Sequence, residues 1–199
     1  MRYKVLQRSL KRFFCEAYFF YMEGMILMQN IIIRNVKQED LWSVSSIVVE
    51  GWKSAYRGII DDEFLDSLKI EDNYNRRLKD YKENGFIVAE INNEVVGFCR
   101  YTINNLFSQD VKDIDCELCA IYVKPDLKRQ GIGKALFNYV IQEQKKNNNK
   151  NMILWCLKEN YNSRKFYEKM GGILYGENEI EKGGKKYKEV GYRYDLSRL

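Results

Sequence analysis

The strongest constraint on the fold of this 199-residue chain lies between residues 118 and 157. An apolar run over residues 118–123 predicts a buried strand, and Pro125, the only proline in the chain, ends it. Residues 133–146 then carry apolar side chains at helical spacing, and residues 152–157 form a second apolar run. Strand, helix and strand in this order predict a β-α-β unit whose two strands run parallel.

The segment between the first strand and the helix is basic and rich in glycine. It consists of Lys128, Arg129, Gln130, Gly131, Ile132, Gly133 and Lys134. The N–H groups of a first helical turn have no partner inside the helix, and the helix dipole favours an anion there. Glycine also lets the backbone come close to a ligand. The segment therefore predicts a binding site for a phosphate group.

Two common phosphate-binding loops do not fit this segment. A P-loop requires a first glycine where Lys128 stands, and a serine or threonine where Ala135 stands. The missing hydroxyl would be a magnesium ligand, so a nucleoside triphosphatase is not favoured. A dinucleotide-binding fingerprint requires a third glycine, and Leu136 occupies that position.

The remaining segments complete a fold of the mixed α/β class. Strands are predicted at residues 31–33, 86–91, 95–103, 116–123 and 152–157, with a C-terminal hairpin over residues 173–180 and 186–195. Helices are predicted after Asp40 as an N-cap, over residues 62–68, 71–81 and 133–146, and over residues 163–170. This order predicts a mostly antiparallel sheet that contains one parallel β-α-β unit and has helices on both faces.

We expect one domain over residues 30–199, preceded by an N-terminal extension over residues 1–29. The extension is basic over residues 2–12 and aromatic over residues 13–22. An amphipathic helix is expected here because apolar residues recur at helical spacing, at Leu6, Leu10, Phe13, Ala17 and Tyr21. An upstream start codon is the alternative explanation. The aromatic part is too short and too polar to cross a bilayer, so we expect no membrane partner.

Charge and cysteine content exclude several functions. The net charge is +5, but five basic and two acidic residues fall within residues 1–30, so the remainder carries only +2. That is too little for a nucleic-acid partner. Five cysteines and no histidine predict a cytoplasmic protein with reduced thiols and without His-dependent nucleophilic catalysis. We expect no metal site, because Cys116 and Cys119 point to opposite faces of one strand.

Two ordered motifs resemble the GNAT superfamily of N-acetyltransferases. The first reads IYVKP over residues 121–125 and KRQGIG over residues 128–133, which is similar to the family's Arg/Gln-x-x-Gly-x-Gly/Ala loop. Lys128 departs from the usual arginine or glutamine. The second reads NYNSRKFYEKMG over residues 160–171, similar to the family's Asn-x-x-Ala-x-x-Phe-Tyr-Glu-Lys-x-Gly signature. The resemblance covers about residues 30–195.

This resemblance implies a GNAT-like fold and an acetyl-CoA-dependent N-acetyltransferase without a metal. The backbone of Ile121 and Val123 would pair with the pantetheine amides, and the loop N–H groups would hold the pyrophosphate. The cofactor-binding residues implied in this way are Ile121, Tyr122, Val123, Lys128, Arg129, Gln130, Gly131, Ile132, Gly133, Lys134, Ala135, Asn160, Ser163 and Tyr167. The acceptor amine would attack the thioester directly, within a ternary complex.

The family position of Tyr167 makes it the candidate acid for the departing CoA thiolate, with packing beside Phe166 as the alternative. Glu117 is the candidate base, since a carboxylate inside an apolar strand requires a reason, and a strand-end salt bridge is the alternative. Cys119 is better explained by burial than as an acyl-carrying nucleophile.

The acceptor is less constrained than the donor. Trp52, Tyr56 and Tyr101 are candidates for the acceptor pocket, with core packing as the alternative. A polyamine, an aminoglycoside-like antibiotic, an amino acid or a protein amine would each suit an N-acetyltransferase. The other function we keep is a CoA-binding module of this fold that lacks catalysis and acts in regulation or assembly. The resemblance also allows a homodimer.

Overall fold

The computed structural model describes residues 30–83, 85–104 and 111–199, and the extension predicted over residues 1–29 lies outside them. Ile31–Leu199 forms one compact unit. No helix in the described part of the chain is long and apolar enough to span a lipid bilayer.

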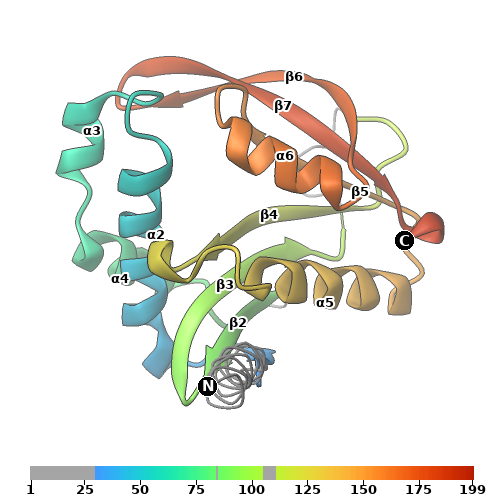
Figure 1. Cartoon of the computed structure of the whole chain (residues 1–199), viewed down its shortest axis with the longest axis horizontal. Helices are drawn as coiled ribbons and strands as arrows, with labels where there is room; N and C mark the ends of the chain where they lie inside the picture. The colour runs from blue at the N-terminus through green and yellow to red at the C-terminus, as the bar shows by residue number, and fades with distance from the viewer. Residues whose placement is uncertain (1–29, 84, 105–110) are drawn as a thin grey trace, which may run out of the picture. The chain divides into compact units, whose positions relative to one another are not determined.

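Seven strands of the described residues form one sheet, in the spatial order β1-β2-β3-β4-β5-β7-β6 (Figure 1). They are β1 (Ile32–Asn35), β2 (Phe86–Ile91), β3 (Glu94–Thr102), β4 (Cys116–Val123), β5 (Asn151–Leu157), β6 (Ile173–Lys182) and β7 (Lys185–Asp195). Neighbouring strands are antiparallel except β4 and β5, which run parallel. The predicted mixed sheet with one parallel pair is confirmed.

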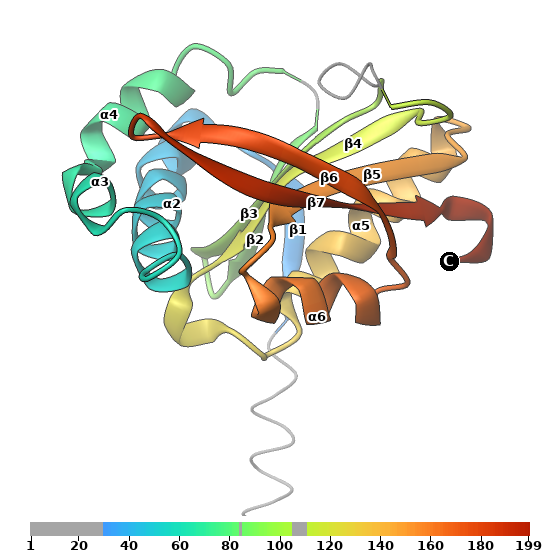
Figure 2. The same ribbon diagram turned by 90° about the horizontal axis from the view of Figure 1, so that it is seen from above.

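Helices of the described residues cover both faces of this sheet (Figure 2). They are α2 (Leu41–Ala55), α3 (Asp62–Ser67), α4 (Ile70–Arg77), α5 (Ile132–Lys146) and α6 (Tyr161–Lys169), with short 3-10 turns at Gln38–Asp40, Pro125–Leu127 and Leu196–Arg198. Side chains of α2 and α4 pack with Phe86, Val88 and Phe98 on one face. Side chains of α5 and α6 pack on the other face in the larger core, which includes Leu136, Phe137 and Tyr192.

The β-α-β unit β4-α5-β5 is paired only at its beginning. Cys116 of β4 pairs with Met152 of β5, and Glu117 pairs with Ile153, after which the two strands share no registered pair. β5 stays paired with β7 as far as Leu157. The carboxyl halves of the two parallel strands therefore diverge.

A β-bulge lies where β4 leaves β5. Arg100 of β3 pairs with Ala120 and the next residue, Tyr101, pairs with Leu118, so Cys119 is an extra residue on β4. A bulge bends its strand and increases the local twist. The bulge thus turns the second half of β4 away from β5, and it does so one residue after Leu118.

Asp40 occupies the N-cap position of α2, as predicted, but its carboxylate does not cap that helix. Its Oδ2 accepts hydrogen bonds from the backbone N–H of Lys37 and from Arg34 Nη1, both at 2.7 Å. Burial alone would raise the pKa of Asp40, yet these hydrogen bonds hold it below its usual range. The 3-10 turn before α2 directs the carboxylate to an earlier N–H group, and Asp40 thereby ties β1 to α2.

Candidate active site

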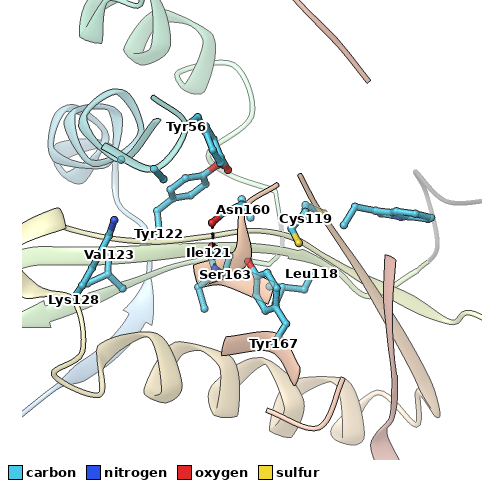
Figure 3. A pocket seen from close by; sticks show the side chains of 15 residues that line it. Tyr56, Leu118, Cys119, Ile121, Tyr122, Val123, Lys128, Asn160, Ser163 and Tyr167 are labelled. Atoms are coloured by element: carbon cyan, nitrogen blue, oxygen red, sulfur yellow. Dashed lines mark hydrogen bonds between the residues drawn. The ribbon is translucent and has the colours of Figure 1, made fainter. Parts of the chain in front are cut away.

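A cavity of about 120 Å³ lies where β4 and β5 diverge, with walls from α2, β4, β5 and α6. Predicted site residues that line it are Tyr56, Ile121, Tyr122, Val123, Lys128, Asn160, Ser163 and Tyr167 (Figure 3). Gly51, Ala55, Trp155 and Cys156 line it as well. No motif pointed to these four, because only the packing of α2 and β5 brings them to the gap.

Tyr167 projects from α6 into this cavity (Figure 3). Its ring lies edge-on to Phe166, with centroids 5.5 Å apart, and 6.0 Å from the ring of Tyr192. Its backbone carbonyl accepts a hydrogen bond from Tyr194 Oη at 3.0 Å, whereas no described residue bonds to the Tyr167 hydroxyl. Burial raises the pKa of this phenol well above its usual range, so it stays protonated at neutral pH.

Tyr56 and Tyr122 approach each other across the cavity from α2 and β4 (Figure 3). Their hydroxyl oxygens are 3.1 Å apart, which is hydrogen-bond distance. Tyr122 stacks on Phe98 with centroids 5.5 Å apart, and Tyr56 lies edge-on to Trp52 at 5.1 Å. Burial raises the pKa of both phenols. The sequence assigned these tyrosines to different ligands, and the structure joins them in one hydrogen-bonded pair.

Glu117 lies at the last position where β4 and β5 are paired, next to the first cavity residue, Leu118, and only 7% of it is exposed. Burial raises the pKa of Glu189 on β7, and the charge of Glu117 raises it further while Lys182 lowers it. Burial, followed by the charge of Glu117, also raises the pKa of the Cys119 thiol to about 12. A thiol that stays protonated at neutral pH is poorly suited to carry an acyl group.

The glycine-rich loop presents unused N–H groups at the start of α5. Gly131 is the N-cap, with a φ of 86° that favours glycine, and no side chain caps the helix. Among the described residues no backbone carbonyl accepts from the N–H groups of residues 131–134. Ala135 differs, because its N–H donates to Gly131 O at 2.9 Å and is not available to a ligand. A row of free N–H groups with Lys128 and Lys134 beside it suits a phosphate group.

Asn160 and Ser163 line the cavity at the start of α6. Asn160 is the N-cap of this helix, and its Oδ1 accepts from the Ser163 N–H at 3.2 Å. This bond fixes the orientation of the amide, so Asn160 Nδ2 is the group that a bound arm could use as a donor.

Comparisons with known proteins agree with this arrangement. Residues 51–172 match the Acetyltransferase (GNAT) family. An uncharacterized N-acetyltransferase of Methanocaldococcus jannaschii is 33% identical over 162 residues, which cover 81% of this chain and 68% of that protein. The chain belongs to the GNAT family.

A further curated relative and a solved structure are similar at lower identity. A spermidine N(1)-acetyltransferase of Thermoplasma acidophilum is 26% identical over 145 residues, covering 71% of this chain and 88% of that protein. The crystal structure of the PaiA N-acetyltransferase from Thermoplasma acidophilum in complex with coenzyme A superposes with a TM-score of 0.62 and 24% identity. The match covers 83% of this chain and 99% of the PaiA chain, so the two proteins share the GNAT fold.

A second opening lies on the α2 and α4 side of the GNAT sheet, and we call it the α4 groove. Its volume is about 530 Å³, and its walls come from α2, α3, α4, β4 and the end of β6. It shares Cys119, Ala120 and Tyr122 with the cavity, so the two openings meet at β4. Trp52 lines this groove and not the cavity, whereas Tyr56 lines the cavity.

The structure does not bring every predicted residue to these openings. Tyr101 lines neither, because its side chain belongs to the core beneath α5, together with Leu118. Ile132 is 1% exposed in the same core, so only its N–H group can reach a ligand. In the described residues no group of three His, Cys, Asp or Glu side chains could hold a metal ion.

Proposed function

We propose that this GNAT protein transfers an acetyl group from acetyl-CoA to an amine, with residues 30–199 as the catalytic domain. The observation that carries the proposal is the divergence of β4 from β5, with the basic loop at one end of the gap and Tyr167 in its wall. The structural neighbour in complex with coenzyme A supports the same donor.

The backbone of β4 and the loop together suit the parts of acetyl-CoA. Beyond Glu117 the β4 backbone edge that faces β5 has no registered strand partner, so Ile121 and Val123 have peptide groups available for the pantetheine amides. The N–H groups of residues 131–134 would bind the pyrophosphate, and Lys128 would add charge beside it. Asn160 and Ser163 would contact the arm between these two regions.

The reaction in this arrangement is a direct transfer. The amine nitrogen attacks the thioester carbonyl carbon, a C–N bond forms, and the C–S bond then breaks. Tyr167 donates its phenolic proton to the leaving thiolate sulfur, and Glu117 accepts the proton from the amine, directly or through water. A positioned acid or base contributes about 10²–10⁴-fold to such a rate. Holding both reactants together supplies a further part of the acceleration.

The test is thiol release from acetyl-CoA by the full chain across a panel of amines, with acetylated product identified by mass spectrometry. The proposal expects turnover with at least one class of amine. Binding of coenzyme A without turnover of any amine would contradict it and would favour the non-catalytic module.

A further inference from the structure

The α4 groove is lined by more positive than negative side chains. The cations are Lys69, Arg76, Arg77 and Lys182, and the carboxylate is Asp72. Field lines concentrate in a groove with apolar walls, and Val48, Trp52 and Phe64 supply such walls here. The groove therefore attracts negative charge and repels a polycation.

These four cations have no ion-pair partner within the described residues, although other cations close to them in the chain do. Arg57 pairs with Asp66 at 2.7 Å, and Lys185 pairs with Asp61 at 3.0 Å. Among the described carboxylates, Asp80 acts on Arg77 and Glu189 interacts with Lys182, but both do so from beyond ion-pair distance. A bound carboxylate would therefore be the first close partner of these cations within the described part of the chain.

Arg77 is the cation best placed to bind such an anion. Its guanidinium lies over the rings of Phe86 and Phe98, 5.3 and 4.9 Å from their centroids, and its Nε donates to Asn73 Oδ1 at 2.7 Å. These contacts fix the plane of the guanidinium and leave its Nη groups to bind. Burial lowers the pKa of Arg77 to about 10, so it is charged at neutral pH and gains from a counter-ion. The charge of Asp80 raises the pKa of Arg77 against this larger effect of burial, but Asp80 lies beyond ion-pair distance.

The opposite charge lies farther along the same face of the sheet. Glu117 of β4 and Glu189 of β7 interact electrostatically there. Neither lines the groove or the cavity, but Glu117 is two residues before Cys119, which lines both. A molecule in the groove would have its amine towards these carboxylates and its other end among the arginines. A volume of about 530 Å³ falls within the range of small-molecule sites and leaves room for an amino acid or a short peptide.

We propose that the acceptor is an amine that carries a carboxylate, as in an amino acid or a short peptide, and that Arg77 and Arg76 bind this carboxylate. The inference rests on the proposed function, because it assigns the acceptor of that reaction. Arg77 forms a fork that matches a carboxylate, and Arg76, Lys69 and Lys182 add positive charge around it. A polyamine, the substrate named for the Thermoplasma acidophilum relative, is disfavoured in this groove.

Matched acceptors test this inference. Each L-amino acid in the panel is compared with its amide and with its decarboxylated amine, and spermidine is included. The wild type should favour the amino acid over its amide by about tenfold or more in kcat/KM, the effect of a charged hydrogen bond. Equal rates for the two, or faster turnover of spermidine, would overturn the inference.

Variants separate the groove from the fold. We expect Arg77→Gln, and Arg76→Glu at an exposed side chain, to lower the ratio of kcat/KM for the amino acid to kcat/KM for its amide towards one. Both variants should leave the KM for acetyl-CoA unchanged. Lys79→Glu makes the same charge reversal outside the groove and should keep the preference. A preference that survives both arginine variants would contradict the proposed contact. If no amine is acetylated, the proposed function fails, and calorimetric binding of amino acids and their amides to the CoA-loaded protein still tests the groove.

Discussion

The substitution Tyr167→Phe removes one oxygen atom from the cavity and keeps the aromatic ring. The ring contacts with Phe166 and Tyr192, at centroid distances of 5.5 and 6.0 Å, remain in place. The lost hydroxyl has no hydrogen-bond partner among the described residues, so its removal leaves no described partner unsatisfied. We therefore expect the free energy of unfolding to change by less than about 0.5 kcal/mol.

The kinetic effect of the same substitution should be large. If Tyr167 protonates the leaving thiolate, its loss should lower kcat by about 100-fold, which is about 2.7 kcal/mol of activation free energy. The KM for acetyl-CoA should stay within about twofold, because the loop residues 131–134 are untouched. Thiol release under steady-state conditions measures both constants, and urea denaturation measures the stability.

Tyr192→Phe is the matched control, since the Tyr192 hydroxyl is bonded but does not line the cavity. It accepts from Arg164 Nε at 3.0 Å and donates to Glu168 Oε1 at 2.7 Å. This variant should lose about 1–2 kcal/mol of stability and keep its kcat. A Tyr167→Phe enzyme with unchanged kcat would refute the acid role. A loss of kcat that matched a loss of stability would instead make Tyr167 a packing residue.

Three other substitutions test separate parts of the reasoning. Glu117→Gln should lower kcat by about 100-fold and remove the acid limb of the pH–rate profile, and a normal profile would exclude Glu117 as the base. Gly131→Ala places a side chain at a φ of 86°. This variant should lower the free energy of unfolding by about 1 kcal/mol and raise the KM for acetyl-CoA about tenfold. Gly176→Ala is the control, because Gly176 has open space around it and an ordinary φ, and it should show neither effect. Asp40→Asn should cost about 2 kcal/mol at pH 7, because Arg34 loses the more buried of its two carboxylate partners and keeps only Glu90. Because the pKa of Asp40 is lowered in the folded protein, its carboxylate contributes fully to stability above about pH 4. This contribution is lost as the pH falls through the pKa of the folded state. The wild type and Asp40→Asn should therefore differ less in free energy of unfolding at pH 3 than at pH 7.

Local sequence patterns were sufficient for most of the secondary structure. The strand predicted over residues 86–91 has the same limits as β2, and the apolar run ended by Pro125 is β4. Asn92 and Asn93 have positive φ at the turn between β2 and β3, as their residue type predicts. These features depend on residues close together in the chain, so the sequence alone could determine them.

Contacts between distant segments decided how the candidate site is built. Tyr101, a candidate for the acceptor pocket, lines neither opening and lies in the core instead. The sequence does not show which face of β3 meets α5, because pairing with β4 decides this. Likewise, no local pattern places an extra residue at Cys119, and this bulge is what turns β4 away from β5.

The chain by itself determined the strand, the basic glycine loop and the helix, because each depends on backbone preferences and spacing within a few residues. Tertiary structure decided that Tyr56 meets Tyr122, residues 66 positions apart, and that Arg77 rests on Phe86 and Phe98 beside an open groove. The first contact forms only when α2 packs near β4, and the second only when α4 packs on β2 and β3. The donor loop was therefore predictable, whereas the acceptor side became visible only in the folded protein.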